Sequence, residues 1–296
     1  MKYLKRIGAT VLAAALAMSF SACGNSSTGN GSASGSAQQN KEMTVEERVE
    51  AARTTMADVK NMEAKMIMLM SMESQGQTLD MNSTMNITSF VEPLKMKIDM
   101  NMDMGELGSQ DMSMYAEETE DGKYIMYVYD GTQWISQEVP VDTFEQYDTR
   151  DSMDMYLDGV TELKDAGTEK VDDKDAVRID GIITGDALEE TIKSSGALDN
   201  MKQTLGGQID DATLDSMFKD LGNISVSIWL DSETNYPVKY SMDMTDVMGK
   251  LYNNIFSAIP GGEEAQINVS KMLINMEGLK YNADITDFEI PAEAKQ

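Results

Sequence analysis

The segment KMKIDMNMDM (residues 95–104) alternates apolar with polar side chains, and most of its apolar positions are methionines. Thioether sulfur is a soft ligand that suits Cu(I), so a methionine cluster could hold copper. Copper sites of this kind usually combine methionine with histidine in short segments, whereas this chain has 27 methionines and no histidine. The spacing is instead that of one face of a β-strand. We therefore expect neither a metal nor a cofactor.

The polar positions of the same segment match the beginning of a calcium-binding loop. Asp99, Asn101 and Asp103 have the spacing of the first ligands of an EF-hand. The loop then requires glycine where Met104 stands and a bidentate glutamate where Gln110 stands. These side chains are better interpreted as the outward face of a strand, although weak Ca²⁺ binding by so acidic a surface stays an alternative.

The usual catalytic groups are scarce. The chain has no histidine and one cysteine, so the common general bases and nucleophiles are missing. The 51 Asp and Glu residues make accidental carboxylate pairs unavoidable, and a glycosidase-like pair stays open as an alternative. We expect a protein without enzymatic activity.

The N-terminal residues 1–22 have the pattern of a secretory signal. A basic MKYLKR is followed by the apolar run IGATVLAAALAMSF, which is too short to span a membrane. The following Ser21-Ala22-Cys23-Gly24 resembles the lipobox of bacterial lipoproteins, in which the cysteine is acylated. The resemblance implies that Cys23 carries a diacylglyceryl group, and two acyl chains suffice for stable anchoring. We expect a lipid-anchored protein on the extracytoplasmic face of the cell membrane.

The rest of the chain divides into a tether and one domain. Residues 23–41 are rich in Gly, Ser and Asn and predict a flexible tether. Residues 42–296 are long enough for a single domain with a substantial core. The net charge of −27 repels nucleic acid and anionic headgroups, so we expect no nucleic-acid partner and membrane attachment through Cys23.

The first half of this domain predicts one helix and then a meander of strands. Thr44 and Glu47 have the spacing of a capping box, which begins a helix over about 44–61. The apolar period then changes from 3.6 to 2, which predicts six consecutive antiparallel strands. Their approximate ranges are 62–72, 79–87, 94–104, 112–116, 124–129 and 134–139.

The second half mixes helices and strands. We predict a weak helix over 142–160, two helical stretches between 186 and 221, and a helix over 246–259. Strand alternation recurs at 176–184, 224–230, 238–244, 266–277 and 280–290. This order predicts an α+β fold, with a large antiparallel sheet that has helices on one face.

One hairpin carries a family resemblance. The segment ISVSIWLDSETNYPVKYSMDM (residues 224–244) is similar to a hairpin of the LolA/LppX-like lipoprotein superfamily, with its Trp-x-Asp turn and Pro-Val-Lys return. The first helix, the meander and the ending ITDFEIPAEAK look like an uncharacterised lipoprotein family of Firmicutes (DUF6612-like). The resemblance implies a half-open barrel, a curved sheet wrapped around helices, whose cavity holds acyl chains in better-known members. It implies no catalytic residues.

The methionines of the meander are the candidate binding residues. They are either plain core under helices or the lining of a cavity, and methionine adapts well to varied apolar ligands. The candidate lining is Met66, Met68, Met70, Met81, Met85, Met96, Met100, Met102, Met112 and Met114.

Three functions follow from these interpretations. The first is an anchored lipoprotein that binds or carries a lipid, an acyl chain or another hydrophobic ligand. The alternative is a non-catalytic interaction protein that presents its acidic face, around Asp99 and Asp103, to an envelope protein partner. A third is oxidant scavenging by surface thioethers.

Overall fold

The structure, a computed structural model, describes residues 43–74, 76–119, 121–139, 150, 157, 159–194, 216–258 and 267–295. The predicted signal peptide, the tether and most of the predicted helix 142–160 lie outside these residues. The same is true of most of the second helical stretch before residue 221, so these predictions stay untested.

The described elements are three α-helices, two short 3-10 helices and eleven strands. The helices are α2 (Val45–Met56), α5 (Gly185–Ser194), α8 (Thr245–Ala258), η1 (Gly105–Leu107) and η4 (Ala292–Lys295). The first strands are β1 (Asn61–Ser74), β2 (Gln77–Val91), β3 (Leu94–Asp103), β4 (Ser109–Glu118), β5 (Tyr124–Tyr129) and β6 (Trp134–Val139). The others are β7 (Val160–Val171), β8 (Lys174–Ile183), β9 (Ile224–Asp231), β10 (Pro237–Asp243) and β11 (Ile267–Tyr281).

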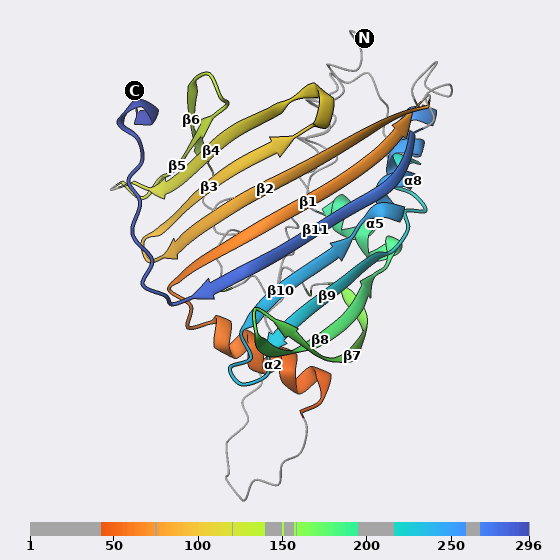
Figure 1. Ribbon diagram of the computed structural model, residues 1–296, viewed down its shortest axis with the longest axis horizontal. Coiled ribbons are helices and arrows are strands. Elements are labelled where there is room, and N and C mark those ends of the chain that lie inside the picture. The colour runs from red at the N-terminus through yellow and green to blue at the C-terminus, as the bar shows by residue number, and fades with distance from the viewer. Residues whose placement is uncertain are drawn as a thin grey trace, which may run out of the picture.

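All eleven described strands form one antiparallel sheet in the order β6-β5-β4-β3-β2-β1-β11-β10-β9-β8-β7. Figure 1 shows this broad, twisted sheet with α5 and α8 behind it and α2 at its lower end. The chain runs outward from β1 to one edge at β6, begins again at the opposite edge with β7, and returns inward to β11. The predicted α+β class, with a large curved antiparallel sheet and helices on one face, is confirmed.

The first helix begins where the capping box predicts. The Thr44 hydroxyl accepts a hydrogen bond from the Glu47 backbone N–H at 3.2 Å, and the Glu47 carboxylate accepts one from the Thr44 N–H at 2.8 Å. Val49, Ala52 and Met56 are the buried positions of this helix. It ends before the predicted residue 61 because the chain turns after Met56 to enter β1.

The main core lies between the sheet and the helices. It joins α2, α5 and α8 to the inward face of β1 and β8–β11, and its most deeply buried large side chains include Leu188, Ile228, Tyr240 and Met272. The six-strand meander and the hairpins that build this sheet follow the predicted alternation. The only helical turn within the described meander is η1, between β3 and β4.

Strand β7 was not predicted. It is an edge strand, and nearly all of its residues are exposed on both faces. A strand with two wet faces has no alternation of apolar and polar residues to detect. Val160, the last residue of the predicted helix 142–160, is instead the first residue of β7.

The predicted strand 280–290 is wrong beyond Tyr281, where β11 ends. Residues 282–290 belong to none of the described strands. Phe288 packs instead on the outer face of the sheet, with its ring centroid 6.0 Å from that of Phe90 and 5.8 Å from that of Tyr115. The Lys295 amino group then pairs with Glu117 at 2.7 Å. Apolar and polar residues do alternate after Tyr281, but this alternation places side chains against the outer face of the sheet and does not form another strand.

Candidate functional site

The ten candidate methionines lie on one face of the sheet, the face that packs on the helices. The strand register links all ten through directly opposite inward positions of β1, β2, β3 and β4. We call this inward surface of β1–β4 the methionine face. Whether its residues touch a ligand stays a prediction.

One row of directly opposite residues across five strands consists of methionine alone. It runs through Met276 on β11, Met66 on β1, Met85 on β2, Met100 on β3 and Met112 on β4. Side chains directly opposite each other have Cβ atoms about 4.5–5.5 Å apart. The row is therefore a continuous strip of unbranched thioethers, which can repack around an irregular apolar surface.

Burial is uneven across the inward face, with deep burial on β9 and partial exposure at some positions of β1, β3, β4 and β6. Ile228 on β9 is 1% exposed, Met66, Met100 and Met112 are half-buried, and Ile135 on β6 is 49% exposed. Among the described residues, the inward side chains Ile98, Met100, Met112, Met114 and Val128 belong to no buried cluster. On β3 and β4, Ile98, Met100, Met112 and Met114 are thus the inward positions left half-buried, whereas Met96 and Met102 are buried.

Two serines interrupt the methionine face and were missed in the sequence. Ser83 and Ser89 occupy inward positions of β2, and each is 2% exposed. Neither Oγ atom has a hydrogen-bond partner among the described residues. The sequence does contain a signal for them. Ser83 and Ser89 are each an even number of residues from Met85, so in a strand all three side chains point to the same face.

A polar groove of about 460 Å³ lies elsewhere, between the beginnings of α8, β9 and β11. Asn223, Asp243, Asp246, Lys250 and Asn268 are among its lining residues, and none of the ten candidate methionines is. The Lys250 amino group binds the Asp246 carboxylate at 3.0 Å, so these charges are already paired. This groove does not suit an apolar ligand.

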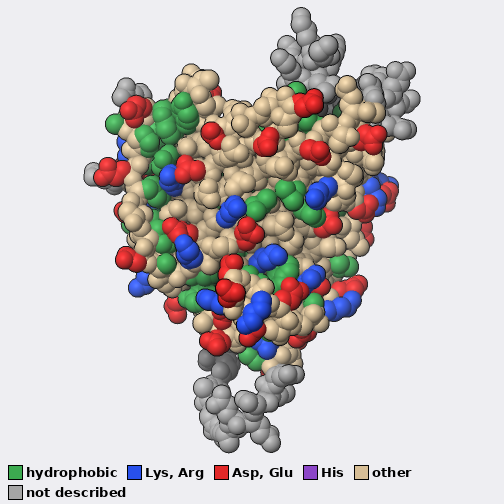
Figure 2. Space-filling view, in the orientation of Figure 1, with side chains coloured by type: hydrophobic (Ala, Val, Ile, Leu, Met, Phe, Trp, Pro, Cys, Tyr) green, Lys and Arg blue, Asp and Glu red, His purple; other side chains and the backbone are tan. Residues whose placement is uncertain are grey.

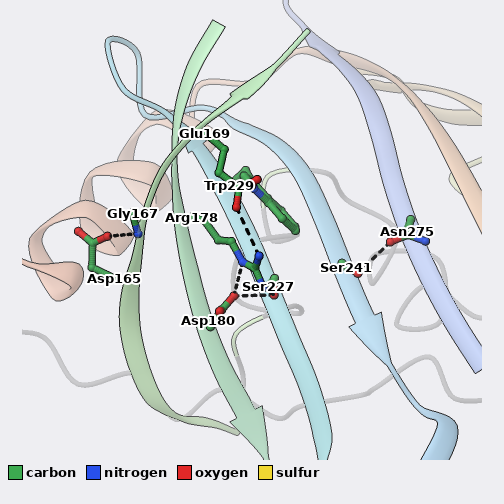
Figure 3. A network of polar contacts seen from close by, with 9 residues as sticks. All are labelled: Asp165, Gly167, Glu169, Arg178, Asp180, Ser227, Trp229, Ser241 and Asn275. Carbon is green, nitrogen blue, oxygen red and sulfur yellow. Dashed lines mark hydrogen bonds and ion pairs between the residues drawn. The ribbon is translucent and has the colours of Figure 1, made fainter. Parts of the chain in front are cut away.

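The outer face of β7–β11 is held by a polar network (Figure 3). The Arg178 guanidinium donates to Asp180 at 2.7 Å and to Glu169 at 3.3 Å, and the Ser227 hydroxyl donates to Asp180 at 2.6 Å. The Trp229 ring N–H donates to Glu169 at 3.2 Å. The network therefore fastens the edge strand β7, through Glu169, to β8 and β9.

The Trp-x-Asp and Pro-Val-Lys motifs form the β9–β10 hairpin. Lys239 lies directly opposite Trp229, with its amino group 4.5 Å from the ring centroid. Asp231 accepts hydrogen bonds from the backbone N–H groups of Glu233 and Thr234, both at 2.9 Å. The motifs therefore stabilise a turn and a cross-strand pair, which is architecture and not chemistry.

The turn formed by Asp231 makes a testable contribution to stability. Burial alone would raise the pKa of Asp231, but hydrogen bonds from the Thr234 and Glu233 backbones outweigh it, and the pKa lies below its ordinary value. A lowered folded-state pKa stabilises the protein above the unfolded pKa, and this contribution is lost as the pH falls through the folded pKa.

We expect Asp231→Asn to reduce the free energy of unfolding at pH 7 by roughly 1–3 kcal/mol, because hydrogen bonds to a charged group are lost. The difference from wild type should shrink as the pH is lowered from 5 to 2, as measured by urea unfolding. Glu233→Gln makes the same charge change at an exposed neighbour and is the control. A difference from wild type that does not change with pH would contradict the role of the Asp231 charge.

Asp99 and Asp103, the residues of the calcium-like pattern, are bound within the chain. The Asp99 carboxylate lies 2.7 Å from the Lys97 amino group, and this hydrogen bond raises the pKa of Lys97. Asp103 accepts a hydrogen bond from the backbone N–H of Gly105 at 2.9 Å. In the part of the chain that the structure describes, no three His, Cys, Asp or Glu residues gather in a way that could hold a metal ion.

Figure 2 shows the outer face, where acidic and basic side chains are mixed over much of the sheet and hydrophobic ones gather over β4–β6. The hydrophobic group includes Tyr115 and Trp134, whose ring centroids are 5.8 Å apart. No helix within the described ranges is both long enough and apolar enough to cross a membrane.

Known proteins resemble this chain in part. LppX, a lipoprotein of Mycobacterium tuberculosis, is 10% identical with a TM-score of 0.39, and the match covers 82% of this chain and 97% of that one. LprF of Mycobacterium bovis is 11% identical with a TM-score of 0.43, and the match covers 82% of this chain and 94% of that one. No curated protein matches the sequence. A family described as "Family of unknown function (DUF6612)" matches residues 44–296, which confirms the predicted resemblance, and the chain belongs to this family.

Proposed function

We propose that this protein is a membrane-anchored extracytoplasmic lipoprotein without catalytic activity, and that it binds or carries a hydrophobic ligand, a lipid or acyl chain, on the methionine face. The observation that supports this most is the half-buried strip on β3 and β4, which includes Met100, Met112 and Met114 and lies outside the described core. Exposed apolar surface of this kind marks binding sites more often than isolated exposed residues do.

The chemistry of this strip suits such a ligand. Its neighbours along the same strand rows are methionine, isoleucine and valine, so a bound chain would meet only apolar atoms there. Burying apolar area stabilises a complex by roughly 25 cal/mol per Å². Methionine adds the ability to adapt to chains of different length or branching.

The experiment is a titration of the full chain carrying Cys23→Ser with the apolar dye N-phenyl-1-naphthylamine, followed by native mass spectrometry without detergent. We expect saturable dye fluorescence that an acylglycerol displaces, and a population with added mass that carries acyl chains. A single mass that matches the bare chain, together with no saturable dye binding, would contradict the proposal.

The anchoring part of the proposal is tested separately in cells. Because Cys23 is the chain's one cysteine, Cys23→Ser removes the acylation site. We expect wild type in the membrane fraction and the variant in the soluble extracytoplasmic fraction. Ser21→Ala keeps a small residue before Cys23 and is the control. A variant that stays in the membrane fraction after a carbonate wash would argue against lipid anchoring.

A further inference from the structure

Two buried hydroxyl groups on the methionine face lack partners. The Oγ atoms of Ser83 and Ser89 have none among the described residues, and both side chains are 98% buried, with 2% exposed. A buried hydroxyl that has given up its hydrogen bonds to water is destabilising unless something replaces them. Most buried polar groups in native proteins do have a partner. A bound molecule would supply the partner that the described residues do not.

The surroundings of each hydroxyl are apolar. Ser83 lies directly opposite Met68 on β1 and Met102 on β3. Ser89 lies directly opposite Met62 and Met96 on the same two strands. Each hydroxyl is therefore framed on both sides by thioethers, so a ligand that reaches it meets largely apolar surroundings.

The distance between the two hydroxyls can be compared with the length of a bound chain. They are six residues apart on one strand, which spans roughly 20 Å. Met85 and Ile87 are the inward positions between them. An acyl chain placed along β2 in either direction would thus lie on apolar side chains, with its ester carbonyl near one of the two hydroxyls.

We propose that Ser83 or Ser89 donates a hydrogen bond to the ester carbonyl oxygen of an acyl-ester lipid whose hydrocarbon lies along the methionine face. This inference rests on the proposed function and specifies its ligand. An ester carbonyl accepts a hydrogen bond and carries no charge. The described inward positions of β1–β4 hold no charged residue that could neutralise the carboxylate of a free fatty acid.

The test compares two probes that differ in the carbonyl, 1-palmitoylglycerol and 1-O-hexadecylglycerol. Both displace N-phenyl-1-naphthylamine from the full chain carrying Cys23→Ser. We expect this protein to bind the ester about 2- to 10-fold more tightly than the ether, the range that one net hydrogen bond supplies. Adding Ser83→Ala with Ser89→Ala should bring the ratio to one and leave the affinity for the ether unchanged.

The matched control is Ser227→Ala, which removes a hydroxyl on the outer face that is bound to Asp180. It should leave the ester-to-ether ratio unchanged. Thermal unfolding without ligand gives a second measurement. The midpoint should rise for Ser83→Ala with Ser89→Ala, because an unpartnered hydroxyl is removed, and fall for Ser227→Ala.

Three results would overturn the inference. These are equal binding of both probes by the protein with both serines, a preference for the ester that survives Ser83→Ala with Ser89→Ala, and a lower unfolding midpoint for that double variant. The first does not depend on whether the variants fold. If the protein with both serines binds neither probe, the proposed function itself is contradicted.

Discussion

Replacing Met100 and Met112 with glutamate is expected to lower the affinity for N-phenyl-1-naphthylamine and for acylglycerols by about 100-fold or more, because a ligand would have to bury two unpaired carboxylates. Both methionines are half-buried, so the carboxylates can stay hydrated in the free protein. Stability should therefore change less than affinity does. The measurement is the dye titration, with urea unfolding in parallel.

The control adds the same charge to the opposite face of the sheet. Asn82 and Asn86 are exposed on β2, and they alternate with the inward Met81 and Met85. Asn82→Glu with Asn86→Glu should leave the affinity within about twofold of wild type, since outward surface substitutions usually have small effects. If both glutamate pairs weaken binding equally, the net charge and not the methionine face controls the titration.

Replacing Ile228 with alanine is expected to lower the free energy of unfolding by about 2–5 kcal/mol. Ile228 is 1% exposed and lies directly opposite Tyr240 and Ile179, within the core that α2, α5 and α8 cover. Its truncation leaves a cavity that the surrounding side chains fill only in part. Urea unfolding followed by circular dichroism measures the loss.

Ile135→Ala is the matched control, because Ile135 is an inward isoleucine of the same sheet that is 49% exposed. Its expected cost is below about 1 kcal/mol, since it buries little area to lose. Equal losses at the two positions would mean that the inward face is evenly packed, and the distinction between core and ligand-binding strip would fail.

Together these variants test whether the inward face of the sheet has two parts, one that supports folding and one that binds the ligand. The rows that cross β8–β11 hold the helices, as the burial of Ile228 and Tyr240 shows. The row through Ile228 and Tyr240 is left half-buried where it reaches Met100 on β3 and Met112 on β4. Substitutions on the first part should act on folding, and substitutions on the second should act on binding.

The meander was predictable because alternation with one wet face is a strong signal. KMKIDMNMDM became β3 with Met96 and Met102 buried and Asn101 and Asp103 exposed, as a strand with period 2 requires. Local cues were equally reliable where they act over a few residues, such as Thr44 with Glu47.

The strand predictions failed where the alternation of apolar and polar residues does not coincide with the pairing of strands. Strand β7 pairs without alternating, because it is exposed on both faces at a sheet edge. Residues 282–290 alternate without pairing, because Phe288 and Ile290 pack across the outer face. Pairing depends on partners distant in the sequence, which a local pattern does not contain.

The sequence predicted which side of the sheet carries the candidate site, but it did not predict which residues lie opposite each other across the strands. The ten methionines could be assigned to one side of the sheet from spacing alone. The five-strand methionine row needed the register of β11 against β1, which joins the two ends of the domain. Ser83 lies inward although it is polar, because its position in the strand sets its direction.

The pairing of β1 with β11 has a consequence for folding. Chain entry and chain exit from the sheet meet at its middle, so a ladder between the two ends of the domain joins Met62 to Tyr281 at one end and Ser74 to Ile267 at the other. Until β11 has been synthesised, β1 presents an unpaired fourteen-residue edge to its surroundings. Non-local pairing of this kind is slow, and open strand edges invite aggregation. A chain that stops short of residue 267 should therefore aggregate more readily than the finished chain, in which β11 covers this edge of β1.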